Sequence, residues 1–209
     1  VRPRAAADRL PLVLVVHENR GLNPHIEDIA RRLALDNFIA FAPDALTSLG
    51  GYPGDEDAAR ALFAKLDQAK TNEDFAAAAG YLQKVEGGNG RLGAVGVCWG
   101  GGVVNLLATR LLTLIAAVPF YGPAPALDQV SKIKAQLLLH FAQHDERRDD
   151  DRQQLVVRPG EDRPGGLRAG LGVGRPRTED RDASFDVLGA RRGEDHRARR
   201  PGTGLDPLG

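Results

Sequence analysis

The stretch RLGAVGVCWGGGVVNLLATR (residues 91–110) contains the only cysteine of this 209-residue chain, Cys98. An apolar run leads into the cysteine. Glycines stand two residues before it and at the second, third and fourth positions after it, and a helical pattern follows. The apolar run predicts a buried strand and the later pattern predicts a helix, so Cys98 would occupy a tight turn between them.

Residues 96–100 spell G-x-C-x-G, the pattern of a nucleophile elbow with cysteine in place of serine. Such a turn lifts the nucleophile above the sheet, and its glycines let the strand and the helix pass closely. The N-terminus of a helix favours a thiolate and offers backbone N–H groups to a developing oxyanion. We therefore predict that Cys98 is a nucleophile.

Two other interpretations of this turn fit the sequence less well. A free cysteine is often a small buried apolar residue, which would make Cys98 part of the core. A dinucleotide-binding loop would need glycine at position 98 and an acidic residue about 20 residues later. The next acidic residue after the cysteine is Asp128.

Outward from the turn, apolar runs of strand length alternate with helical patterns from residue 10 to about residue 146. Continuous apolar runs are typical of strands buried on both faces. Asn23 can cap the first helix and Pro24 suits its first position. The alternation predicts an α/β fold whose mostly parallel sheet carries helices on both faces. We expect strands at 10–18, 38–43, 92–98, 114–122 and 135–142, and helices at 23–36, 55–70, 72–83 and 100–110.

The overall composition excludes several classes of protein. A net charge of zero gives no basic field for nucleic acid or for a membrane surface. The apolar runs are far shorter than the roughly 20 residues of a membrane-spanning helix, and no signal-peptide cleavage site follows the N-terminus. One cysteine excludes an internal disulfide and fits a reducing compartment. We expect a soluble cytoplasmic protein.

No cofactor or metal site is expected, since the histidines do not form an H-x₃-H or HExxH arrangement. His17, His25, His140 and His144 are expected at strand ends or on the surface rather than in catalysis. The chain begins at Val1 and contains no methionine, so we expect its natural N-terminus to be missing.

The composition changes abruptly at residue 147. The last 63 residues contain 14 Arg, 11 Gly, 9 Asp and 5 Pro, with one aromatic residue, Phe185. This segment shows neither period 2 nor period 3.6, so it offers no face to bury. We divide the chain into a core at 1–146 and a tail at 147–209. The tail is either a disordered polar segment or the product of a reading-frame error in a GC-rich gene.

Several segments are recognisable together: VVHENRGLNPHIEDIARRLA, FIAFAPDAL, GGYPGDEDAARALF, GAVGVCWGGGVVNLLA, AAVPFYG and LLLHFAQHDER. The set covers most of residues 12–147 and resembles the dienelactone hydrolase family, the carboxymethylenebutenolidases and their relatives. The resemblance implies an α/β-hydrolase fold, incomplete here at its N-terminal strands and C-terminal part. It also implies hydrolysis of a small lactone or ester by a Cys, His, Asp triad.

The same resemblance assigns roles to particular residues. Cys98 matches the nucleophile, and Asp145 matches the triad acid that fixes the tautomer of the histidine. Glu18 matches a carboxylate that interacts with the resting thiol and helps to generate the thiolate. The backbone N–H groups of Asn19 and Trp99 would form the oxyanion hole.

The remaining member of the triad is missing. The family places its histidine near HGF, but no histidine occurs between His144 and His196, and nothing around His196 resembles that loop. The resemblance thus implies a hydrolase whose activity is impaired. The alternative is a non-catalytic pseudoenzyme or a thiol redox protein with a reactive cysteine. Glu18 could also be a surface carboxylate paired with Arg20, and Asp145 could lie in a solvated loop.

Overall fold

The computed structural model describes residue 1 and residues 9–142. Within this part the fold is an α/β fold, as the alternating pattern predicts. Asp145, His144, His196 and the predicted tail at 147–209 lie outside the described residues, and so does the predicted domain boundary.

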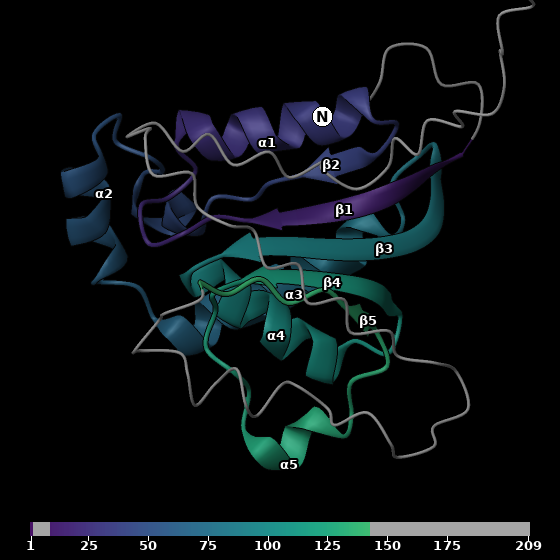
Figure 1. The fold of residues 1–209 in the computed structure, drawn as a ribbon. Helices are drawn as coiled ribbons and strands as arrows, with labels where there is room; N and C mark the ends of the chain where they lie inside the picture. The colour runs from purple at the N-terminus through teal and green to yellow at the C-terminus, as the bar shows by residue number, and fades with distance from the viewer. Residues whose placement is uncertain (2–8, 143–209) are drawn as a thin grey trace, which may run out of the picture. The chain divides into compact units, whose positions relative to one another are not determined.

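The described strands form one sheet in the order β2-β1-β3-β4-β5, and each neighbouring pair is parallel (Figure 1). All five predicted strands are present. The third is longer than predicted and the last is much shorter. The strands are β1 (Leu10–Val16), β2 (Ile39–Phe41), β3 (Gly88–Val97), β4 (Leu114–Phe120) and β5 (Gln136–Leu137).

The described helices are α1 (Pro24–Leu35), α2 (Glu56–Phe63), α3 (Gln68–Leu82), α4 (Trp99–Arg110) and α5 (Leu127–Val130), with a 3₁₀ helix η1 (Ala45–Leu49). As predicted, Asn23 caps α1 by accepting a hydrogen bond from the Ile26 N–H at 3.1 Å. The helix predicted at 55–70 is wrong in its extent. It ends at Phe63, and Asp67 caps a new helix by accepting from the Lys70 N–H at 3.1 Å.

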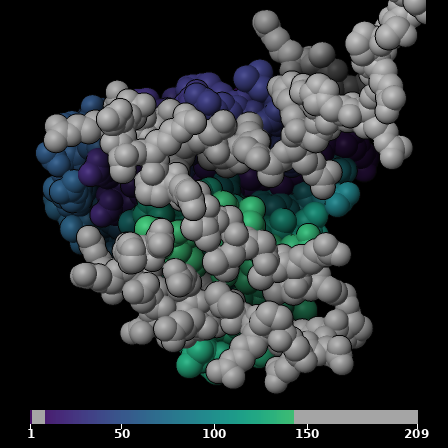
Figure 2. All heavy atoms as spheres, in the orientation of Figure 1, coloured from purple at the N-terminus to yellow at the C-terminus, as the bar shows by residue number. Residues whose placement is uncertain are grey.

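Helices cover both faces of the sheet. On one face, α3 and α4 pack against alternate residues of β1, among them Leu12 and Leu14. On the other, α1 packs against the intervening residues Val13 and Val15. Figure 2 shows atoms of α1 and α2 at the molecular surface, in purple and blue. None of the described helices is long and apolar enough to cross a membrane.

The order of the strands places a switch point between β1 and β3. The chain runs from β1 outward to β2 and then returns past β1 to β3. In open α/β sheets, ligands bind at the carboxyl ends of the strands at such a point. The register pairs Val16 of β1 with Gly96 of β3. Glu18 comes two residues after Val16, and Cys98 comes two residues after Gly96. Both of these residues therefore follow the same end of adjacent strands.

Candidate active site

Cys98 occupies the sharp turn that the sequence predicts. Its backbone angles are φ 55° and ψ −116°, in a region that residues with a Cβ rarely adopt. Such a conformation costs about 1–3 kcal/mol and persists only where the surroundings enforce it. Here the Cys98 N–H donates to the Phe120 carbonyl at 3.0 Å, and the Cys98 carbonyl accepts from the Gly102 N–H at 3.2 Å. The cysteine is thus held between β4 and the first turn of α4.

The glycines around the turn allow backbone to meet backbone. A Cβ on Gly96 would lie 2.2 Å from the Gly100 carbonyl oxygen. A Cβ on Gly100 would lie 2.4 Å from the carbonyl oxygens of both Val16 and His17. The first turn of α4 therefore lies directly against the ends of β3 and β1, a distance that only glycine permits.

Glu18 and Asn19 lie in the loop directly after β1 and are partly buried. Arg20 forms an ion pair with Glu56. The alternative in which Arg20 pairs with Glu18 is therefore wrong. Among the described residues, no backbone carbonyl accepts a hydrogen bond from the N–H of Asn19 or of Trp99. These two donors have the freedom that an oxyanion hole requires.

Tyr121 is a further residue of this region, which the sequence analysis missed. It follows β4 directly and has φ 38°. Burial raises the pKa of the Tyr121 hydroxyl, and the negative charges of Glu18 and Cys98 raise it further. Residues from the ends of β1, β3 and β4 therefore converge. The position of Tyr121, at the carboxyl end of the strand beside β3, is the signal that could have identified it.

His17 lies directly after β1, at a strand end as the sequence predicts, but the sequence did not reveal its contacts. Its side chain is fully buried at the end of β1. Nε2 accepts a hydrogen bond from the Ala45 N–H at 2.9 Å, so Nδ1 carries the proton and donates to the Glu18 carbonyl at 2.5 Å. The Asp44 carboxylate lies 3.6 Å from Nε2. The imidazole is therefore neutral and bonded at both nitrogens.

Two acidic residues hold the loop after β1. Glu56, in the first turn of α2, binds the Arg20 guanidinium and accepts from the Asn23 amide at 3.0 Å. Asp44 accepts from the backbone N–H groups of Leu22 at 3.3 Å and Leu46 at 3.0 Å. The loop that contains Glu18 and Asn19 is thus tied to α1, α2 and η1.

The side chain of Trp99 packs among three rings. Its ring centroid lies 5.6 Å from that of His17, 4.8 Å from that of Phe63 and 5.7 Å from that of Phe75. Its indole N–H donates to the Gln68 side chain at 2.8 Å. These contacts fix the residue that follows the predicted nucleophile.

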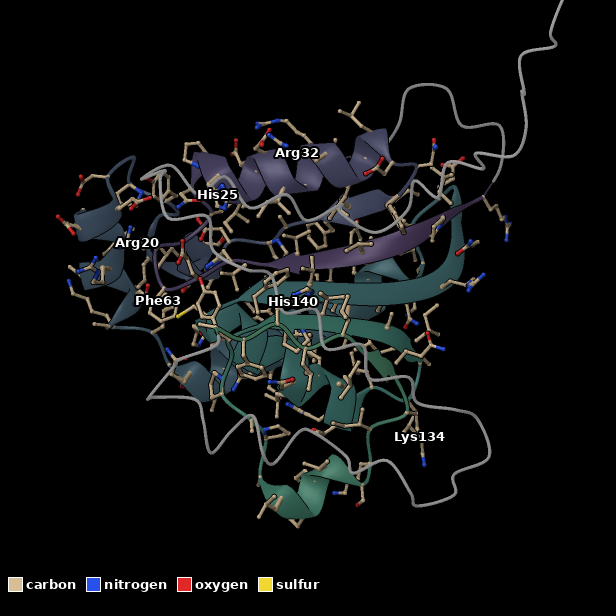
Figure 3. All side chains as sticks on the ribbon, in the orientation of Figure 1. Arg20, His25, Arg32, Phe63, Lys134 and His140 are labelled. Carbon is tan, nitrogen blue, oxygen red and sulfur yellow. The ribbon has the colours of Figure 1, made fainter. Side chains whose placement is uncertain are left out.

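Neither the predicted triad acid nor a partner histidine can be placed at this site, because Asp145 and His196 lie outside the described residues. His140 (Figure 3) lies three residues after the end of β5 and forms an isolated parallel bridge with Phe120. Its ring stacks on that of Phe120 with centroids 4.3 Å apart. Its backbone continues the sheet, accepting from the Tyr121 N–H at 2.7 Å. Within residues 9–142, no group of three His, Cys, Asp or Glu side chains could hold a metal ion.

Stability should fall as the pH drops below the ordinary pKa of histidine. Burial lowers the pKa of His17 from 6.5, outweighing the Glu18 carbonyl and the Asp44 carboxylate, which raise it. The unfolded chain then binds the proton more readily than the folded one, so stability is full above pH 6.5 and is lost as the pH falls towards the lower folded pKa. Burial also lowers the pKa of His140, which acts in the same direction.

Urea unfolding followed at about pH 8, 6 and 5 would measure this loss. In the His17→Gln variant the loss of stability on acidification should be smaller, because only His140 and any other titrating group then contribute to it. An unchanged pH dependence in that variant would contradict the prediction.

The parallel sheet and the strained turn after β3 together define an α/β-hydrolase fold. The family model of the dienelactone hydrolase family matches residues 1–158, so the chain belongs to that family. The chain spans about half the length of the curated relatives it matches.

Individual relatives agree with this assignment. A hydrolase fragment of Escherichia coli K12 is 55% identical over 67 residues, which cover 32% of this chain and 57% of that protein. A candidate carboxymethylenebutenolidase of Salmonella typhimurium is 38% identical over 125 residues, 58% of this chain and 46% of that protein. The crystal structure of a candidate dienelactone hydrolase from Klebsiella pneumoniae superposes with a TM-score of 0.63. It is 29% identical and the match covers 74% of this chain and 72% of that one.

Proposed function

We propose that the chain opens a small lactone or ester by attack of the Cys98 thiolate on the carbonyl carbon. The observation that carries this proposal is the strained backbone of Cys98 at the start of α4, enforced from two neighbouring strands. Strain of this kind is expected where a nucleophile must be held above a sheet. Family membership supports the same class of substrate.

The first chemical step needs only groups near this turn. The Glu18 carboxylate takes the proton of the thiol when substrate arrives, and the thiolate sulfur attacks the carbonyl carbon. The backbone N–H groups of Asn19 and Trp99 stabilise the oxyanion of the tetrahedral intermediate. Its collapse breaks the ring C–O bond and leaves a thioester on Cys98, with the alkoxide or enolate still part of the same acyl group.

The second step, hydrolysis of the thioester, is where this chain is expected to be slow. Asp145 is the proposed triad acid, but no histidine lies between His144 and His196 to activate the water that attacks the thioester or to protonate the alkoxide left by ring opening. Loss of a triad member typically lowers turnover by orders of magnitude, although the oxyanion hole leaves residual catalysis. We propose an enzyme that acylates readily and turns over poorly.

The missing histidine also favours the second candidate, a pseudoenzyme or thiol redox protein that keeps a reactive cysteine. The choice is linked to the segment at 147–209, which we propose is either a polar tail or the product of a changed reading frame. Resequencing the coding region would identify a frame error. A single cysteine suits a reducing compartment, which supports a place in the cytoplasm.

Mass spectrometry after mixing with a small cyclic enol-lactone tests the proposal. Because ring opening expels no fragment, we expect one adduct of the full lactone mass on Cys98, followed by its slow loss. Iodoacetamide labelling of the same sample reports whether the cysteine is reactive at all. Rapid labelling without any lactone adduct would favour the non-catalytic alternative, and absence of both would make the turn purely structural.

A further inference from the structure

We infer that His17 is a positioning residue that joins the two backbone segments of the proposed oxyanion hole. It is neither the nucleophile nor a proton carrier in the proposed reaction. The inference rests on the proposed function, because it concerns the geometry in which the Asn19 and Trp99 N–H groups meet the oxyanion.

The first link runs to the Asn19 N–H. The Glu18 carbonyl, which accepts from His17 Nδ1, belongs to the same peptide group as the Asn19 N–H. A trans peptide is planar, and its C=O and N–H bonds point in opposite directions. Holding the carbonyl on the buried imidazole therefore aims the N–H away from the core.

The second link runs to the segment that follows the nucleophile. The His17 ring stacks on the Trp99 ring at a centroid distance of 5.6 Å and an interplanar angle of 30°. The His17 carbonyl oxygen would lie 2.4 Å from a Cβ on Gly100, so its backbone also contacts the first turn of α4. A shift of the imidazole would move both proposed donors relative to each other.

A neutral histidine suits this place for a chemical reason. The buried ring must donate at one nitrogen, to the Glu18 carbonyl, and accept at the other, from the Ala45 N–H. Neutral imidazole has one donor and one acceptor, so both needs are met without burying a charge. Leucine could fill the space and meet neither need, whereas asparagine can keep the donor near the Nδ1 position.

Two reactions of Cys98 separate positioning from general structural support. Acylation by p-nitrophenyl acetate passes through a tetrahedral oxyanion, whereas alkylation by iodoacetamide is a direct displacement without one. Misplacing a catalytic group by about 1 Å can cost about 100-fold in rate. For His17→Leu we therefore expect acylation to fall by roughly 10- to 100-fold while alkylation stays within about 2-fold of the unmodified chain.

Matched variants accompany this test. His25→Leu makes the same substitution at an exposed position of α1 and should change neither rate. His17→Asn should recover part of the acylation rate. If His17→Leu does not fold, the acylation rates of His17→Asn and His17→Gln are compared instead. Asparagine keeps the bond to the Glu18 carbonyl, whereas glutamine keeps the bond to Ala45.

Each outcome has a distinct meaning. Selective loss of acylation in His17→Leu, or faster acylation in His17→Asn than in His17→Gln, supports the positioning role. Equal loss of both reactions, or no loss of either, overturns it and leaves the proposed function standing. An unmodified chain that alkylates but never acylates overturns the proposed function and the positioning role with it.

Discussion

Gly100→Ala should destabilise the fold more than the same substitution at any other glycine of α3 or α4. The new Cβ would lie 2.4 Å from the carbonyl oxygens of Val16 and His17, and both obstacles are backbone atoms of β1 and the residue after it. A side chain can rotate away from such a contact, but these carbonyls cannot. Overpacking typically costs 1–3 kcal/mol, and we expect a loss of about 3 kcal/mol or more in the free energy of unfolding.

Gly80→Ala provides the matched control. Gly80 lies inside α3, and a Cβ there would meet nothing within 4 Å. Alanine is the better helix residue, so this variant should gain about 0.5–1 kcal/mol. Urea unfolding can follow both variants by the emission of Trp99, the only tryptophan. A Gly100→Ala variant as stable as the unmodified chain would mean that α4 does not lie against β1 as described.

The same close approach explains why the elbow could be predicted from sequence. The rule behind the motif is local, since a strand, a strained residue, glycines and a helix follow one another directly along the chain. The turn at Cys98, the end of β3 and both ends of α4 were therefore predicted to within one residue, whereas β3 begins four residues before its predicted start. Apolar runs identified the other strands for a similar reason, because a strand buried on both faces has no polar side to confuse the pattern.

The parts that the sequence did not reveal depend on contacts between distant segments. His17 acquires its role from Ala45 and Trp99, which approach it only once β2 and β3 have joined β1. Glu56 binds Arg20 across 36 residues, and nothing in its own helix indicates that partner. The break between α2 and α3 is of another kind, because it has a local signal: Asp67 is a good N-cap residue, and it marks the start of α3 in the sequence itself.

Removing the sulfur of Cys98 should have the largest effect on chemistry. With p-nitrophenyl acetate we expect the unmodified chain to release one equivalent of nitrophenolate in a burst and to gain one acetyl group. In Cys98→Ala the burst should disappear entirely, leaving only slow acetylation of exposed groups such as Lys132 and Lys134. The reason is that the chain has one cysteine, so this variant has no thiol that could accept the acetyl group.

Cys98→Ser distinguishes the thiolate from the mere shape of the turn. Serine keeps the size and the strained backbone, but its hydroxyl is a weak nucleophile unless a general base removes the proton. Because the proposed site has no identified histidine, the burst of this variant should be slower by about 100-fold or more. A serine burst as fast as that of cysteine would show that a base is present after all, and His196 would be the first residue to replace.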